Sequence, residues 1–470
     1  MFNYSLVFAL LGVFATIYQI SDDYKKRNFK FQIEMYDIFL LFIFLFMIIF
    51  IGFHNDLNYH WEIENYQLSS RLLAELCLLG FSTYLVYRYF ILLNSKVINN
   101  IKKYNETFNQ YINLQKYDNI INDLDVYRNQ LLGDDYTVIK SNLENLIKND
   151  FFVERLVNTN AYLSIIILNK DIEWESLDGF IHLLFPKLLD KQGSMIYYET
   201  KIIDYNVKVK YETYKIEDKV LYNSIFDSLE NLKKFQRLAH VFGEYAIDRL
   251  KERHSIENDP GNKHEEEYDD YSNKKWRDPI FISIHFFDIM IRQGIYFGIH
   301  DFLDLNYYHF FLSIILKNIK YDDNYDDVEA ATFYEFYLDT IFNNYCDWIQ
   351  FAAHDKNLTD NIIIKETLKF LFYGFEKVIR STILRDSIKR AIFRKILHAI
   401  KYLADCNNEI NHSITIAKNI IKKIEEVDII SQELWCLLWR DFRGVHINDH
   451  NINRSISEII YNKCNFNREE

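Results

Sequence analysis

The sequence IFLLFIFLFMIIFIGF occupies Ile38–Phe53 of a 470-residue chain. Gly52 is its only residue without an apolar side chain, and with Tyr36 and Asp37 the segment reaches the ~18 residues that a helix needs to cross a ~30 Å hydrocarbon core. A helix at the surface of a soluble protein would carry polar residues along one face. The stretch therefore predicts a transmembrane helix.

Two other segments are nearly as apolar. The first, residues 4–20, has no charged residue, and the second, residues 72–94, has only Glu75 and Arg88. These two side chains lie roughly 20 Å apart along one helix, so they cannot pair, and we expect Arg88 to extend to the membrane surface. The sequence thus predicts a transmembrane region over residues 1–94 with three spans, at about 4–20, 36–53 and 72–94.

The loops between these spans predict the orientation. The first loop contains Lys25, Lys26, Arg27 and Lys30, whereas residues 54–70 contain Asp56, Glu62 and Glu64 but no Lys or Arg. By the positive-inside rule, the N-terminus is outside and the C-terminus is cytoplasmic, as in a multi-pass protein of the bacterial inner membrane. A cleaved signal peptide is disfavoured, because no Lys or Arg precedes residues 4–20 and no small-x-small site follows them.

The composition predicts a folded, helical body. Hydrophobic residues make up 49% of the chain and aromatic residues 17%, while only three prolines and 12 glycines interrupt it. The bias toward Ile, Asn, Lys, Tyr and Phe fits a low-GC bacterial genome. The five cysteines are widely spaced and form no C-x-x-C pair, which is unlike a disulfide framework or a zinc site and favours a reduced, cytosolic body.

Hydrophobic periodicity divides this body into segments. Residues 95–133 carry an apolar side chain at every third or fourth position, which predicts an amphipathic stalk helix. Such a helix could pair with a second copy of the chain or pack on the body. Residues 142–253 are expected to form an α+β unit, with a small β hairpin or sheet around 194–216, where apolar and polar residues alternate.

The rest of the chain is expected to be helical. Residues 254–279 form a charged linker that contains Pro260 and Gly261. Residues 280–470 form a helical cytosolic domain. Its two most apolar stretches, residues 280–303 and 307–321, are predicted to be core helices, since charged residues interrupt the first and the second is too short to span a membrane.

Several enzyme classes lack their motifs. The chain has no G-x-x-x-x-G-K-[ST], G-x-G-x-x-G, G-x-S-x-G or H-E-x-x-H sequence, which argues against P-loop, Rossmann, α/β-hydrolase and zincin chemistry. The acidic run Asp322–Asp327 lacks the glycine and the final glutamate of a calcium loop. No cofactor and no resident metal are predicted.

Weaker metal-binding patterns support an alternative, a membrane-tethered metal-dependent phosphohydrolase or nuclease. A phosphohydrolase would use a His-Asp doublet with one more histidine and aspartate, from the set His300, Asp301, His309, His354, Asp355 and Asp405. A nuclease would use Asp190, Glu199 and Lys201. Both patterns occur at the frequency expected by chance. A loop assignment is favoured for His446 and His450, and a buried structural role for Cys346.

The strongest charge anomaly is the basic segment, residues 365–401, which has ten Lys or Arg against three acidic residues in a chain of net charge −13. One helix here would bury an apolar stripe and carry an anion- or nucleic-acid-binding set on its other faces, formed by Arg385, Lys389, Arg390, Arg394 and Lys401. A nucleic acid, a nucleotide and the acidic inner leaflet are all suitable partners. Pairing with the protein's own acidic residues is the alternative.

Taken together, these features favour a non-enzymatic membrane effector or regulator with a cytosolic sensing or interaction body. Toxin-like, membrane-perturbing proteins and bacterial antiviral defence effectors have this layout, which is an analogy of architecture alone. The expected partners are the lipid bilayer, a second copy of the chain through transmembrane or stalk helices, and a protein, nucleic-acid or nucleotide partner of the cytosolic domain.

Overall fold

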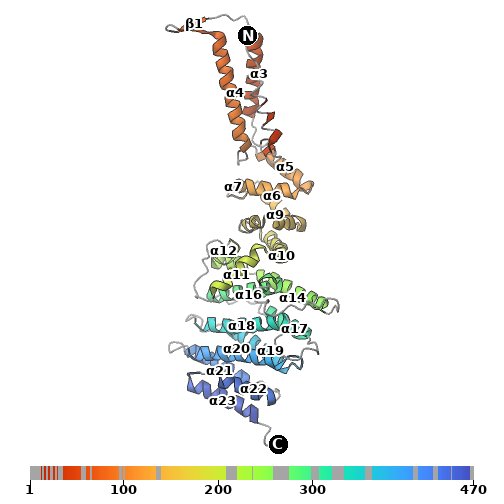
Figure 1. Ribbon diagram of the computed structural model, residues 1–470, viewed down its shortest axis with the longest axis vertical. Coiled ribbons are helices and arrows are strands. Elements are labelled where there is room, and N and C mark those ends of the chain that lie inside the picture. The colour runs from red at the N-terminus through yellow and green to blue at the C-terminus, as the bar shows by residue number, and fades with distance from the viewer. Residues whose placement is uncertain are drawn as a thin grey trace. The chain divides into compact units, whose positions relative to one another are not determined.

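A computed structural model shows a mainly helical chain (Figure 1), as predicted. It describes isolated positions between 12 and 29 and residues 35–53, 60–63, 66–94, 98, 101–133, 139–207, 220–235, 237–257, 275–297, 306–319, 333–354, 362–405, 411–426, 432–445 and 447–465. Two compact units, Met1–Phe180 and Ile181–Glu470, divide the chain. This division falls inside the predicted unit 142–253.

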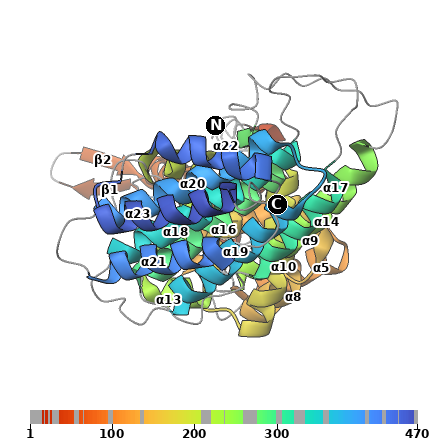
Figure 2. The same cartoon turned by 90° about the horizontal axis from the view of Figure 1, so that it is seen from below.

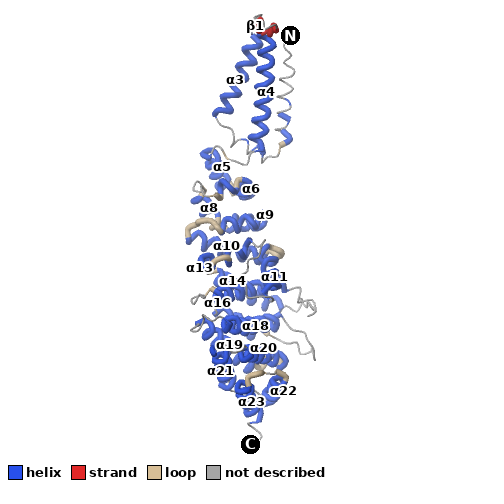
Figure 3. The backbone as a smooth tube through the Cα atoms, turned by 90° about the vertical axis from the view of Figure 1, so that its left-hand side faces the viewer, coloured by secondary structure: helices blue, strands red, loops and turns tan. Residues whose placement is uncertain are grey.

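An antiparallel helical hairpin is the most apolar part of the first unit. It consists of α3 (Met35–Phe53) and α4 (Ser70–Asn94), which contact each other. Between them, β1 (His60–Ile63) pairs with β2 (Tyr66–Ser69), and this short ribbon lies at the tip of the hairpin in Figure 3. The sequence did not predict this ribbon. The helices coincide with the predicted second and third spans, whereas most of the first lies outside the described residues.

One ion pair connects the two helices at the end opposite the ribbon. The Arg88 Nε lies 3.1 Å from the Asp37 Oδ1, and the Asp37 side chain is only 11% exposed. Asp37 is in the first turn of α3 and Arg88 is near the end of α4, so the pair fixes how the ends of the hairpin meet. Arg88 thus has a partner that the sequence analysis did not identify.

The hairpin buries little of its apolar surface. Only Leu40 and Phe44 of α3, and Ser82 and Tyr89 of α4, are buried among its described side chains, with Phe44 stacked on Phe81 at 5.7 Å. Most of the other described large apolar side chains are exposed, namely Met35, Tyr36, Ile38, Phe39, Leu41, Phe42 and Phe46 on α3, and Leu79, Tyr84, Tyr87, Phe90 and Ile91 on α4. Ile43, Phe81, Leu85 and Val86 are half-buried. Soluble monomers rarely expose so continuous an apolar surface.

Across the described residues, one helix meets the length and composition expected of a full membrane span, namely α9 (Asp150–Leu168). Half of its most apolar window is buried within the protein, which is equally typical of a core helix. The described part of α3 adds a shorter apolar stretch, Met35–Phe44.

The stalk region is not one continuous helix. It forms α5 (Ile101–Asn113), α6 (Tyr117–Val126) and α7 (Arg128–Leu131). The break lies at Gln115, which has a positive φ of 52°, and it allows α5 and α6 to pack against each other. Much of their apolar stripe is therefore buried within the chain, including Tyr104, Phe108, Ile121 and Leu124, whereas Leu114 is exposed. The first unit continues through α8 (Lys140–Leu146) and α9 and ends within α10 (Trp174–Asp190).

The predicted strand in the second unit is wrong over residues 195–207, which form the helix α11 (Met195–Val207). Ile196 and Thr200 are both buried, and their separation of four residues is the helical repeat. The alternation that suggested a strand begins at Ile203, near the end of this helix, and continues into residues that are not described. Two short helices follow, α12 (Val220–Phe226) and α13 (Leu229–Lys234).

The remaining helices stack in two rows. One row contains α16 (Pro279–Tyr296), α18 (Phe333–His354), α20 (Asp386–Asp405) and α22 (Gln432–Arg443). The other contains α17 (Asn306–Asn318), α19 (Ile362–Arg380), α21 (Asn411–Glu426) and α23 (His450–Asn465). Each helix contacts the next in its own row, and Figure 2 shows their axes running close to parallel or antiparallel.

This arrangement is a helical solenoid, in which alternating helices build an elongated stack. The helix α14 (Leu238–Glu257) closes one end by packing on α16 and α17. The prediction of core helices over 280–303 and 307–321 is confirmed, because α16 is buried along nearly its whole length and α17 buries Tyr307, Tyr308, Phe311, Leu312 and Ile315. The linker 254–279 lies mainly outside the described residues, apart from the end of α14 and a 3-10 turn at Lys275–Arg277.

A buried polar network joins α16 to α18. The Asp288 carboxylate is 2% exposed and accepts hydrogen bonds from the Trp348 Nε1 at 2.6 Å and the Arg292 Nε at 2.9 Å. Arg292 also donates to Asp347 at 3.1 Å. The Trp348 indole packs on Tyr308 of α17, with 4.8 Å between ring centroids. One carboxylate therefore positions groups on two helices of the stack.

The close approach of α14 to α17 yields a stability prediction. A Cβ at Gly243 would lie 2.4 Å from the Tyr307 ring, and Tyr307 is buried. Although alanine favours a helix by about 1 kcal/mol over glycine, Gly243→Ala should lower the free energy of unfolding by about 1–3 kcal/mol through overpacking. Gly179→Ala on α10, where the nearest atom is 3.8 Å away, should leave stability equal or higher. Thermal melts of the two variants test this, and equal melting temperatures would contradict it.

Candidate functional site

The basic segment, residues 365–401, forms most of α19, the turn after it, and α20. Apolar residues of α19 bury a stripe that includes Leu371, Phe375 and Val378. A Cβ at Gly374 would lie 3.0 Å from Leu312 and 3.2 Å from Phe342, so this glycine marks where α19 approaches α17 and α18 closely. On this helix Lys369 and Arg380 are exposed and Lys377 is half-buried.

Two residues of the predicted anion-binding set pair within the protein. The Arg390 guanidinium makes two hydrogen bonds of 2.7 Å to the Asp441 carboxylate on α22, and the Arg394 Nη2 adds a third at 2.6 Å. The Asp441 side chain is 5% exposed. Burial alone would raise the pKa of Asp441, but the hydrogen bonds and charges of the two arginines outweigh it and hold that pKa below its ordinary value.

The other three predicted residues are dispersed. Lys389 is buried, and its Nζ lies 3.3 Å from the Asp386 Oδ1. Arg385 lies just before the start of α20, and Lys401 is half-buried near its end. The structure therefore joins Arg390 and Arg394 through Asp441 and does not gather the five residues at one point.

The Asp441 cluster predicts a loss of stability on charge reversal. Changing Arg390 and Arg394 to Glu leaves a nearly buried carboxylate beside like charges, which should lower the free energy of unfolding by about 1–3 kcal/mol. In the wild type, the lowered pKa of Asp441 means that its stabilisation is present above the unfolded pKa of about 3.9 and is lost as the pH falls through the folded pKa. The double variant should thus lose part of the acid dependence of unfolding. A variant as stable as wild type at pH 7 would contradict this.

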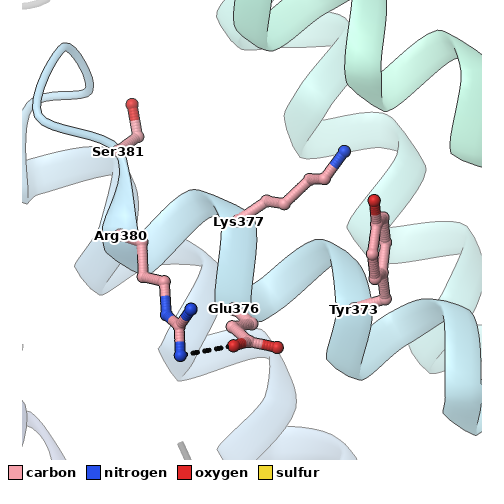
Figure 4. Close-up of a pocket in the computed structure, with 5 residues that line it drawn as sticks. All are labelled: Tyr373, Glu376, Lys377, Arg380 and Ser381. Atoms are coloured by element: carbon pink, nitrogen blue, oxygen red, sulfur yellow. Dashed lines mark ion pairs between the residues drawn. The ribbon is translucent and has the colours of Figure 1, made fainter. Parts of the chain in front are cut away.

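A pocket of about 340 Å³ lies elsewhere in the same segment, over the C-terminal half of α19. Its lining is Tyr373, Glu376, Lys377, Arg380 and Ser381 (Figure 4). The Arg380 Nη2 lies 2.6 Å from the Glu376 Oε1. The Lys377 Nζ lies 4.5 Å from the centre of the Tyr373 ring and 3.2 Å from the Ser313 Oγ of α17.

His309, on α17, lies next to this pocket. Its ring centroid is 4.4 Å from that of Tyr373, and its Nδ1 is buried without a hydrogen-bond partner among the described residues. Burial, followed by the positive charge of Lys377, lowers the pKa of His309, so its ring is neutral at pH 7. The pocket thus combines two cations, one carboxylate, two hydroxyls and a neutral imidazole at its edge.

Glu199 and Asp190, which were considered for a nuclease site, hydrogen-bond to groups within the protein. Both oxygens of Glu199 accept backbone N–H groups at the start of α12, from Leu221 at 3.3 Å and Tyr222 at 2.9 Å, which makes Glu199 a helix cap. Asp190 accepts hydrogen bonds from Tyr245 at 2.7 Å and Arg249 at 2.5 Å. Over the residues that the structure describes, no group of three His, Cys, Asp or Glu side chains is placed to hold a metal.

The remaining candidates are separated or not described. Asp405 accepts the backbone N–H of Asn448 at 3.1 Å. His300, Asp301, Asp355 and His446 lie outside the described residues, as does the His354 side chain, while His450 is exposed at the start of α23. Burial raises the pKa of the Cys346 thiol to about 12, which suits a structural cysteine. Cys436 is disulfide-bonded, unlike Cys77 and Cys346, and this departs from the fully reduced body that was expected.

Comparison of the chain with family models, with curated proteins and with solved structures finds no match. Tyr373 and Ser381 were not predicted from the sequence, and His309 was considered there only as a candidate metal ligand. A signal existed for part of the pocket, because Tyr373, Glu376, Lys377 and Arg380 follow the three-and-four spacing of one helix face, but His309 is brought near only by the packing of α17 on α19.

Proposed function

We propose that this chain is an integral membrane protein in which the α3–α4 hairpin is embedded in the bilayer and the second unit recognises a ligand or partner. The observation that carries this proposal is the exposed apolar surface on both helices of the hairpin. With 19 residues, α3 is about 28 Å long, close to the ~30 Å of a hydrocarbon core. Exposure of that apolar surface to water is unfavourable, whereas lipid tails would solvate it.

The polar groups of the hairpin fit the same environment. Arg88 and Asp37 satisfy each other at one end, as ionisable residues within membrane segments commonly do. Between the ion pair and the β1–β2 ribbon the sequence of both helices is mostly apolar, with Arg71 and Glu75 near the ribbon end of α4. The positive loop residues Lys25–Lys30 favour a cytosolic location for the end that carries the ion pair and for the residues after α4.

The second unit supports a recognition role. Solenoids of stacked helices offer extended surfaces to partners and owe their stability to contacts between neighbouring helices. We propose that ligand binding to this stack changes how the membrane helices associate, so that the protein acts as a non-enzymatic effector or regulator. A toxin-like or antiviral effector that permeabilises the inner membrane would work in this way, with several copies joined through the exposed faces of α3 and α4.

Expression in bacterial cells tests the effector role. Membrane potential and growth are followed for the full chain and for a variant that lacks residues 1–94. The full chain should depolarise the cells and slow their growth once it is expressed strongly or activated, and the truncated chain should do neither. Toxicity that persists after the truncation would contradict a membrane effector and favour a cytosolic enzyme.

The orientation gives a separate prediction. A reporter that works only in the cytosol should be active when it is fused after Glu470, and a reporter that works only in the periplasm should be inactive there. The reason is that the positive loop residues hold that side of the membrane region inside the cell. Replacing Lys25, Lys26, Arg27 and Lys30 by neutral residues should reduce this preference. Strong periplasmic activity of the wild-type fusion would overturn the proposed topology.

A further inference from the structure

Among the residues that the structure describes, no carboxylate pairs with Lys377. No carboxylate oxygen in the described part of the chain lies within 4 Å of its Nζ, which contacts the Ser313 hydroxyl and the face of the Tyr373 ring. The residue is half-buried at the pocket wall. Because the pocket also holds the Arg380–Glu376 pair, the charge of Lys377 makes its lining net positive, which attracts an anion.

The surrounding groups are suited to bind the oxygens of such an anion. The Ser381 hydroxyl accepts the backbone N–H of Leu384 at 3.2 Å, which leaves its own hydrogen available for donation. Arg380 pairs with Glu376, but both side chains are more than 40% exposed. Exposed ion pairs of this kind contribute only about 0–1 kcal/mol, so Arg380 can turn toward a bound anion at little cost.

We propose that this pocket binds a small phosphate monoester, with Lys377, Arg380 and Ser381 on the phosphate and the Tyr373 ring beside the organic group. A phosphate monoester carries a charge of about −1.5 to −2 near pH 7 and three acceptor oxygens, which matches two cations and a hydroxyl. The volume of about 340 Å³ suits one phosphate with one ring system. This phosphate monoester would be the class of ligand that the proposed recognition unit senses. Binding at the pocket can be tested without the sensing role, and only its physiological meaning rests on that proposed function.

Calorimetric titration of the full chain in detergent tests the site. The probes are adenosine monophosphate, inorganic phosphate and adenosine, which lacks the phosphate. Lys377→Gln should weaken binding of the monophosphate by about tenfold or more, as expected when a charged hydrogen bond is lost, and Lys377→Arg should retain most of it. Arg454→Gln is the control for the loss of one positive charge, because Arg454 lies on α23, outside the pocket, where it pairs with Glu458.

The outcomes separate the possibilities. Binding of the monophosphate and of phosphate, but not adenosine, with loss only in Lys377→Gln supports the site. If vesicles containing phosphatidic acid bind through Lys377 and the soluble probes do not, the phosphate belongs to a lipid headgroup. No binding of any phosphate probe at millimolar concentration, or equal losses in Lys377→Gln and Arg454→Gln, overturns the proposal. If no phosphate probe binds but the full chain is still toxic to membranes, the effector role is retained and the phosphate site is rejected. If a phosphate probe binds but the chain is not toxic, the phosphate site is retained and the effector role is rejected.

Discussion

A chain that carries Phe42→Arg and Phe46→Arg is expected to lose its stable association with membranes. Both side chains belong to α3 and are exposed, by 65% and 67%. An arginine at the centre of a membrane helix costs about 2.5–3.5 kcal/mol on insertion scales, so the pair should disfavour insertion of α3 by about 5–7 kcal/mol. In a water-soluble protein the same exposed changes would alter stability by only about 0.5 kcal/mol each.

The measurement is the fraction of protein that remains in the membrane pellet after extraction with alkaline carbonate. Two control variants distinguish an effect of arginine on α3 from the effect of changing these phenylalanines and from that of adding charge elsewhere. Phe42→Leu with Phe46→Leu keeps the surface apolar and should remain in the pellet. Tyr198→Arg with Tyr461→Arg places two arginines at exposed positions of the second unit, 65% and 55% exposed, and should also remain. Equal retention of the Phe42→Arg, Phe46→Arg chain would contradict insertion of α3.

The second large effect is expected at the buried polar network of the solenoid. Asp288→Ala removes a carboxylate that is 2% exposed and leaves Arg292, 15% exposed, without its closest counter-charge. Removing one partner of a buried ion pair costs about 3–5 kcal/mol, and the Trp348 Nε1 also loses its acceptor. Since a domain is stable by only about 5–15 kcal/mol, the second unit should melt at a much lower temperature.

Two matched variants check the origin of this loss. Asp288→Asn keeps an acceptor for Trp348 but removes the charge, so its loss should be smaller than that of alanine. Asp339→Ala breaks the pair with Lys395 at a carboxylate that is 42% exposed, and it should cost about 0–1 kcal/mol. Chemical denaturation followed by tryptophan fluorescence reports all three. Similar free energies of unfolding for Asp288→Ala and Asp339→Ala would show that the network does not stabilise the stack.

Local patterns predicted much of this fold. The apolar run at Ile38–Phe53 coincides with α3, and the length and interrupting charges of residues 280–303 predicted a core helix, found as α16. Both predictions depend on residues close together in the chain. The α5–α6 break was not visible, because the apolar stripe continues across Gln115 in the same period while the backbone turns there.

Contacts between residues that are far apart along the chain could not be predicted from the sequence. Asp441 lies 51 residues from Arg390, and no pattern in either segment specifies the other. The hairpin or sheet predicted around residues 194–216 is wrong over 195–207. The apolar side chains there fit the spacing of a helix as well as that of a strand, and the tertiary contacts of α11 with α16 and α12 favour the helix. The basic segment was identified correctly as unusual, but the division between cations that pair internally and cations that line a pocket depends on which face each neighbouring helix covers.

The most direct test of membrane insertion is the reactivity of Cys77. This free thiol is exposed on α4, seven residues after Ser70, and would face lipid in an inserted hairpin. Open membrane fragments are treated with a charged, membrane-impermeant maleimide, and labelled cysteines are located by mass spectrometry. Cys77 should stay unlabelled until detergent is added and then react. Rapid labelling of Cys77 in the open fragments before detergent is added would show that α4 is in water and would contradict the membrane anchor.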